Sequence, residues 1–175
     1  MPIRSLIRTI PHHPKPGVMF RDITTLLKDP AGFKLTIERL AAHYRGRRVD
    51  KVAGIEARGF IIAAPLAFAL GVGFVPLRKR GRLPWTTVGH DYSLEYGTDR
   101  IEMHVDAIAA GEQVLVADDL IATGGTAEAA IRLIAGAGGT VVGCAFVIEL
   151  PDLGGRARLE ALGHPVLALC AFEGD

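Results

Sequence analysis

The stretch Val114–Thr126, VLVADDLIATGGT, decides the interpretation of this sequence. An apolar run typical of a buried strand leads into two carboxylates, Asp118 and Asp119, and a Thr-Gly-Gly-Thr turn follows directly. A helical pattern begins near Thr126. Strand, glycine turn and helix in this order predict a βα unit of a parallel sheet, in which ligands bind at the carboxyl ends of the strands.

The two halves of this stretch favour opposite chemistries, and a suitable ligand must satisfy both. Gly124 and Gly125 lack Cβ atoms, so their N–H groups can approach an oxyanion at a helix N-terminus, with hydroxyl donors nearby. The carboxylates repel anions and need hydrogen-bond donors. A ribose 5-phosphate offers both hydroxyls and a phosphate. The stretch is neither a Walker loop nor a dinucleotide fingerprint, because no Gly-Lys-Ser/Thr and no Gly-x-Gly-x-x-Gly occurs.

The rest of the chain repeats the βα pattern. Asp29 is a suitable N-cap for a helix that starts at Pro30 and carries an apolar stripe through Tyr44. We expect strands over 51–57, 72–77, 113–117, 140–150 and 165–172, with helices over 58–71 and 125–138. Gly138 and Gly139 stand where a helix C-cap belongs. These elements predict an α/β fold with a parallel sheet and helices on both faces.

The segment 78–97 is polar and rich in arginine and lysine, which predicts a loop. It is long for a connection inside a compact domain, so we interpret it as a lid or binding loop. A stretch over 100–105, RIEMHV, alternates like a strand with one face in water.

Composition narrows the class of protein. The length of 175 residues suits a single domain, 1–175, and the net charge of +1 does not favour nucleic acid as a partner. Cys144 and Cys170 lie in apolar runs, as expected of free thiols in the cytoplasm, and no secretion signal is recognised. The uncharged stretch 60–77 is interrupted by proline and glycine, which favours a helix and a strand over a membrane span.

Three other stretches accompany the first one. They are Pro16–Thr24 (PGVMFRDIT), Gly54–Phe60 (GIEARGF) and 78–97, which begins RKRGRLP and ends YSLEYG. With Val114–Thr126 they resemble the type I phosphoribosyltransferases, in particular the adenine-using members. The similarity runs from Pro16 to Glu149 in the family's order. It implies a small N-terminal hood and base-binding segment at about 1–30, and a flexible catalytic loop at about 78–97.

The resemblance implies that the protein converts 5-phosphoribosyl-1-pyrophosphate (PRPP) and adenine to AMP and pyrophosphate. The acid pair would hold the ribose hydroxyls and the glycine turn the 5-phosphate, while GIEARGF would form a pyrophosphate loop with a cis peptide bond between Glu56 and Ala57. The implied PRPP and AMP contacts are Glu56, Ala57, Arg58, Arg78, Lys79, Asp118, Asp119, Ala122, Thr123, Gly124, Gly125 and Thr126.

The resemblance also implies catalytic roles for Glu95, Arg58 and Lys79, with basic loop residues reaching across a homodimer interface. A closed basic loop would neutralise the leaving pyrophosphate and exclude water. No compact set of metal ligands is evident, so Mg²⁺ would come bound to PRPP and water rather than to a protein site. The middle of the loop, 85–91, does not match the family's pattern.

The identity of the base has one internal clue. Family members that use oxopurines carry a lysine well after the phosphate loop, whereas this chain has no lysine beyond Lys79. Adenine would instead meet main-chain groups and apolar side chains, and the predicted base contacts are Val18, Met19, Phe20, Arg21 and Leu120. Two alternatives stay open: an enzyme for another purine, or a PRPP- or nucleotide-sensing regulator on the same scaffold.

Overall fold

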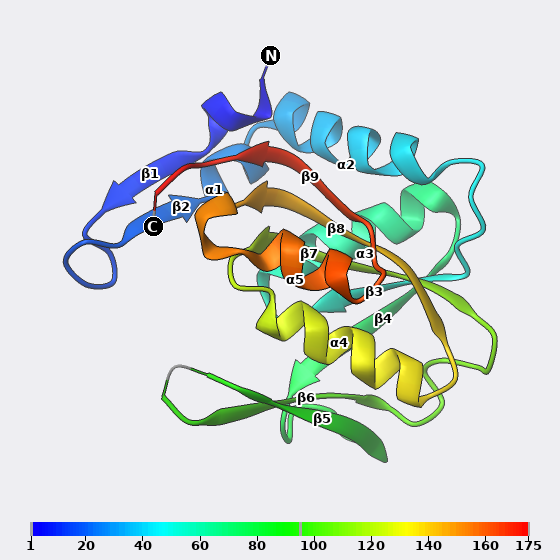
Figure 1. The fold of residues 1–175 in the computed structure, drawn as a ribbon. Helices are drawn as coiled ribbons and strands as arrows, with labels where there is room; N and C mark the ends of the chain where they lie inside the picture. The colour runs from blue at the N-terminus through cyan, green and yellow to red at the C-terminus, as the bar shows by residue number, and fades with distance from the viewer. Residues whose placement is uncertain (1, 95, 175) are drawn as a thin grey trace.

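A seven-stranded sheet with helices on both faces organises the protein. The computed structural model describes residues 2–94 and 96–174. The strand order is β5-β6-β4-β3-β7-β8-β9 (Figure 1). Five strands run parallel: β3 (Lys51–Ile55), β4 (Gly73–Lys79), β7 (Gln113–Ile121), β8 (Thr140–Glu149) and β9 (Val166–Ala171). The predicted α/β class is therefore confirmed, with one difference at an edge.

Two apolar layers hold the helices against the sheet. Helices α2 (Pro30–Tyr44) and α3 (Arg58–Leu70) pack on one face, and α4 (Gly125–Gly136) and α5 (Gly155–Ala161) on the other. Side chains alternate along β7, so Leu115 and Ala117 enter the first layer while Val114 and Val116 enter the second. This central strand is buried on both faces, and it fixes where its carboxyl end presents polar groups.

The predicted helix boundaries follow from local signals. The Asp29 carboxylate accepts a hydrogen bond of 2.8 Å from the Gly32 N–H, so it caps α2 as expected. Helix α3 ends at Gly71, whose φ of 69° is the left-handed cap conformation. The 60–77 stretch is thus a helix followed by β4. Among the residues described, no helix is long and apolar enough to cross a membrane.

The prediction of a loop over 78–97 is wrong in its middle. Thr87–Ser93 forms β5, which pairs antiparallel with β6 (Thr98–His104) through seven residues. Strand β6 then joins the parallel sheet through Arg78 and Lys79 of β4 only. Period-two patterning in β5 is weak, because none of its residues is fully buried and both of its faces are partly exposed to solvent. The sheet is therefore mixed, with an antiparallel hairpin at one edge.

Two strand predictions need correction. The 100–105 stretch does not have one face in water, because Ile101, Glu102 and Met103 are all buried. Glu102 is tolerated there because it accepts hydrogen bonds from the Gly81 N–H and the Thr87 hydroxyl. Strand β7 continues to Ile121, so the acid pair lies inside the strand and not after it. Polar side chains can remain in a strand when each finds a partner.

A small antiparallel sheet precedes the main one. Strand β1 (Arg8–Pro11) pairs with β2 (Met19–Asp22), between the short helices η1 (Ile3–Leu6) and α1 (Thr24–Leu27). Asp22 joins the two strands, because its carboxylate accepts from the Arg8 side chain and from Thr24. This sheet lies beside the carboxyl ends of the parallel strands and corresponds to the predicted hood (Figure 1).

Candidate active site

The two carboxylates of the acid pair have different hydrogen-bond donors. Asp119 is 4% exposed and its Oδ2 accepts a hydrogen bond of 2.6 Å from Arg58 Nε at the start of α3. Asp118 lines the hollow at the N-terminus of α4, and its Oδ1 accepts from the Asp119 N–H at 2.8 Å. A Cβ on Gly59 at the start of α3 would lie only 2.7 Å from the same oxygen. Burial, and then the charge of Asp119, raise the pKa of Asp118 well above its usual range. The two carboxylates therefore face different partners.

The predicted phosphate turn forms a hollow at the N-terminus of α4. The hollow measures about 120 Å³ and is lined by Asp118, Leu120, Ile121, Ala122, Thr123, Gly124, Gly125, Thr126, Ala127 and Phe146. Gly124 has a φ of 83°, which only glycine adopts without strain. The positive end of the helix dipole points to this hollow, which makes it an anion site in physical terms.

Helix α5 packs against the glycine turn. The Gly155 N–H donates to the Ala122 carbonyl at 3.0 Å, and a Cβ on Gly155 would lie only 2.4 Å from that oxygen. Arg158 forms an ion pair with Glu128 in the first turn of α4. The sequence did not reveal this support, because it comes from contacts about thirty residues apart along the chain.

The predicted pyrophosphate loop lies at the end of β3. The peptide bond between Glu56 and Ala57 is cis, as predicted. The Glu56 carboxylate accepts hydrogen bonds from Arg78 Nη2 at 3.1 Å and from the Lys79 N–H at 3.0 Å. Burial alone would raise the pKa of Glu56, but these donors outweigh it and lower the pKa. Glu56 is therefore a fixed anion that holds two basic residues of β4 beside the loop.

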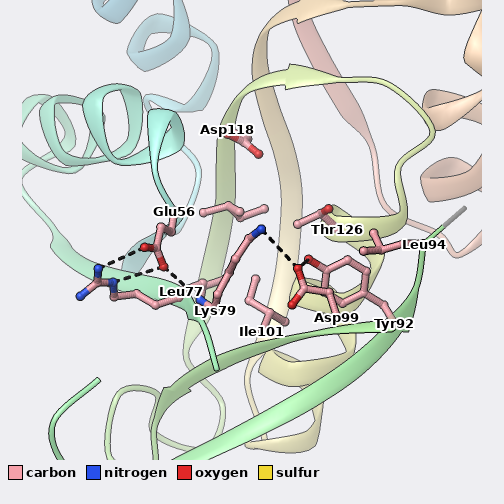
Figure 2. A pocket seen from close by; sticks show the side chains of 11 residues that line it. Glu56, Leu77, Lys79, Tyr92, Leu94, Asp99, Ile101, Asp118 and Thr126 are labelled. Carbon is pink, nitrogen blue, oxygen red and sulfur yellow. Dashed lines mark hydrogen bonds and ion pairs between the residues drawn. The ribbon is translucent and has the colours of Figure 1, made fainter. Parts of the chain in front are cut away.

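A second hollow separates this loop from the turn (Figure 2). It measures about 270 Å³, and its lining includes Glu56 directly after β3, Lys79 of β4 and Asp118 of β7. Figure 2 shows the Lys79 ammonium extended across the hollow toward Asp99 of β6, with which it forms an ion pair of 3.3 Å. Tyr92 of β5 contacts the same carboxylate through its hydroxyl, at 3.3 Å. The antiparallel hairpin thus supplies one wall of the hollow.

A third hollow opens between the hood and the sheet. It measures about 370 Å³ and is lined by Val18, Met19, Phe20, Arg21, Arg58, Leu120, Leu150 and Leu153. All five residues predicted to contact the base are therefore present in one place. Arg58 connects the slot to the acid pair. Its guanidinium lies 5.8 Å from the centre of the Phe20 ring and also pairs with Asp119. An apolar slot with main-chain groups along one wall suits a flat heterocycle.

The structure gathers most of the predicted residues around the end of β7. Asp119 and Ala57 line none of these three hollows, although each lies directly beside one through Arg58. Glu95 lies outside the described residues. The hollows also contain residues that the sequence did not indicate: Tyr92, Leu94, Asp99, Leu150 and Leu153. The leucines follow β8 without any motif, so only the fold reveals them.

The fold and this arrangement define the class of protein. The central strand carries an acid pair near its carboxyl end, and a glycine turn and a helix follow it. The chain matches the model of the phosphoribosyl transferase domain over residues 22–161. The chain belongs to the phosphoribosyl transferase family.

Relatives that are similar to this chain over nearly its full length include adenine phosphoribosyltransferases. One from Nitrosospira multiformis is 66% identical to this chain over the full length of both proteins. A crystal structure of the enzyme from Rhodothermus marinus is 53% identical, with a TM-score of 0.92 over 97% of this chain and 96% of that one. The Saccharomyces cerevisiae enzyme, crystallised with an imino-altritol bisphosphate and adenine, is 37% identical, with a TM-score of 0.89 over 96% of each chain.

Proposed function

We propose that this protein transfers the 5-phosphoribosyl group of PRPP to adenine, giving AMP and pyrophosphate in purine salvage. The observation that carries the proposal is the convergence of three hollows on the end of β7: an anion turn, a charged hollow and an apolar slot. Their linings suit the 5-phosphate, the leaving pyrophosphate and the base. The 5-phosphate would occupy the turn, the pyrophosphate the charged hollow, and the base the slot.

The reaction breaks the C1′–O bond of PRPP and forms a bond from C1′ to the base nitrogen. Pyrophosphate leaves with the electron pair, and the base nitrogen loses its proton. The ribose carries positive charge in the transition state, as in glycoside cleavage. Asp118 and Asp119 would hold its hydroxyls and stabilise that charge at the end of β7. We assign proton transfer from the base to Glu95.

The leaving pyrophosphate requires cations. Arg78 and Lys79 line the charged hollow. Within residues 2–94 and 96–174 the Lys79 ammonium pairs with Asp99 alone, and the lysine side chain is 60% exposed. An arriving pyrophosphate group would compete with Asp99 for that ammonium. Mg²⁺ would arrive bound to PRPP and water, where it would neutralise charge on the leaving group.

The slot favours adenine over an oxopurine. Its lining contains no lysine, and both of its arginines already have partners. Arg58 pairs with Asp119, and Arg21 donates to the Thr9 hydroxyl and the Glu173 carbonyl. Main-chain groups of residues 18–21 can accept from the 6-amino group, while Phe20 and Leu120 can pack on the faces of the ring. We retain an enzyme for another purine and a nucleotide-sensing regulator as alternatives.

We further propose that the protein is a homodimer. Helix α3 is apolar after Arg58, yet Ile61, Pro65 and Phe68 recur on one face, and Phe68 is 90% exposed. A helix that is apolar all round is normally buried. The first half of β4 beside it pairs on one side only, because β6 reaches just Arg78 and Lys79. A second copy would cover this face next to the charged hollow.

We also propose a cytoplasmic location. Cys144 and Cys170 are free thiols, and burial raises the pKa of Cys144 to about 12, which keeps it unreactive. Unpaired buried cysteines are typical of reducing compartments.

One assay tests the proposed activity against both alternatives. Purified protein is incubated with Mg²⁺ and PRPP together with adenine, hypoxanthine or guanine, and nucleotide formation is followed. We expect AMP from adenine and little product from the oxopurines. Turnover only with hypoxanthine or guanine would establish the other-purine alternative. Binding of PRPP without turnover of any base would establish the regulator.

A further inference from the structure

The base slot is built from two walls that are remote in sequence. One wall is residues 18–21 of the hood, and the other is formed by Leu150 and Leu153, around the short helix η2 (Pro151–Leu153). Residues 172–174 follow β9 and reach the edge of the hood, and Figure 1 shows this last described segment running toward β2. We infer that this tail is a positioning element that fixes the separation of the two walls.

The tail is anchored to the hood through Phe172. Its ring is 7% exposed, and the guanidinium carbons of Arg4 and Arg21 lie 4.8 Å and 4.6 Å from its centre. Arg21 also donates through Nη2 to the Glu173 carbonyl at 3.2 Å and through Nη1 to the Thr9 hydroxyl. Cation–π contacts and hydrogen bonds thus hold Arg21, the last residue of the hood wall, against the tail.

The same tail is anchored to the opposite wall by its main chain. The Phe172 N–H donates to the Glu149 carbonyl at 3.0 Å, one residue before Leu150. The Gly174 N–H donates to Asp152 Oδ2 at 2.8 Å, one residue before Leu153. Glu149 is itself held by two hydrogen bonds from Arg156, of 2.9 Å and 2.6 Å. The tail therefore contacts the immediate neighbours of both leucines that line the slot.

The consequence concerns the base alone and rests on the proposed function. A slot whose walls are held apart at the right distance loses less entropy when a flat ring enters. The phosphate turn has separate supports in Gly155 and Arg158, so loosening the tail leaves it in place. Phe172 is thus a positioning residue for adenine: it touches neither substrate, and its loss should affect the base and spare PRPP.

The test compares Phe172→Leu with two matched variants. Phe172→Leu keeps an apolar side chain but removes the ring over which the arginines lie, whereas Phe172→Tyr keeps the ring. Phe33→Leu makes the same change at a partly buried phenylalanine of α2 that packs on the same apolar layer. We expect Phe172→Leu to raise the KM for adenine about 5- to 10-fold, with the KM for PRPP within about twofold of wild type. Phe172→Tyr should restore the wild-type value, and Phe33→Leu should leave both constants unchanged.

Amide hydrogen exchange is a second measurement, and it does not depend on enzymatic activity. Exchange should accelerate in segments 18–21 and 150–153 of Phe172→Leu and not in Phe33→Leu. Unchanged exchange in either wall, or an equal rise of both KM values, would overturn the inference. If the wild-type protein makes no AMP, the proposed function fails, while the exchange measurement still decides whether the tail holds the walls.

Discussion

At the scale of single residues, the site depends on two adjacent glycines with different physical roles. Gly124 has a positive φ, and a Cβ there would lie 3.1 Å from the Gly155 main chain. Gly125 lies in ordinary helical conformation, and a Cβ there would first meet Arg158 Nη1, at 3.5 Å. The first glycine is required by the fold, whereas the second leaves open space that a phosphate could use.

Valine substitutions should separate these roles. Gly125→Val should fold normally and raise the KM for PRPP, because its side chain enters the hollow of the turn. Gly124→Val should lower the free energy of unfolding by about 2–3 kcal/mol, since a branched residue is strained at positive φ. Urea unfolding and initial rates measure the two effects. A normal KM for PRPP in a folded Gly125→Val protein would exclude the phosphate from the turn.

The second residue-scale prediction concerns Asp119. Asp119→Asn removes a charge that we assign to the ribose hydroxyls, and it also weakens the hold on Arg58. We expect kcat/KM for PRPP to fall about 10- to 100-fold, the range for hydrogen bonds to a charged group. The exposed Asp106, in the turn after β6, provides the control, because Asp106→Asn removes a carboxylate far from the hollows. Equal kinetics in the two variants would refute the assignment.

At the scale of elements, the sequence predicted the segments whose signals are local. The βα units around β3 and β7, the Asp29 cap and the Gly71 stop all appear as expected. The β5–β6 hairpin was not predicted. Strand β5 forms because it pairs with β6, and the sequence Thr87–Ser93 has no periodicity that indicates a strand. Pairing partners are a property of the folded chain.

The same limit applies to the site. Contiguous motifs predicted the glycine turn and the cis peptide correctly, because neighbours in sequence stay neighbours in space. The five residues predicted to contact the base line one hollow, and their contact with a base stays a prediction. The contact between Arg58 and Asp119 spans 61 residues, and Asp99 reaches Lys79 from the unpredicted hairpin. Such pairs depend on sheet order, which the local patterns did not specify.

The hood gives a prediction about pH. Hydrogen bonds from Thr24 and, to a smaller extent, from Arg8 lower the pKa of Asp22 from 3.8 to about 2. The folded state thus favours the ionised carboxylate, so this stabilisation is complete above pH 3.8 and disappears as the pH falls toward 2. We expect a loss of about 1–2 kcal/mol, because the exposed Arg8 is partly screened by water.

Urea unfolding between pH 7 and pH 2 measures this contribution. Asp22→Asn should lower stability at pH 7 and flatten the decline below pH 4. Glu38→Gln, which breaks an exposed pair with Lys34 on α2, is the control and should change little at any pH. If the free energy of unfolding depended on pH in the same way in the wild type and in Asp22→Asn, the ionised Asp22 would not stabilise the pairing of β1 with β2.

At the scale of the whole molecule, α3 joins the site to the proposed dimer. Its first residue, Arg58, contacts Asp119, and its outer face carries Ile61, Pro65 and Phe68. An uncovered row of this kind on a monomer would be an aggregation liability. The helix that positions the guanidinium thus also offers the surface on which a second copy would dock.

Phe68→Glu tests the dimer directly. Wild-type protein should sediment at twice the chain mass of 18.7 kDa, and the variant at 18.7 kDa, because a buried carboxylate at the interface would be desolvated without a partner. Thermal unfolding of the monomer itself should change little, since Phe68 is 90% exposed in the single chain. Leu162→Glu, at another exposed apolar residue after α5, is the matched control and should stay dimeric. A wild-type mass of 18.7 kDa, or a Phe68→Glu protein that remains a dimer, would remove α3 as the interface.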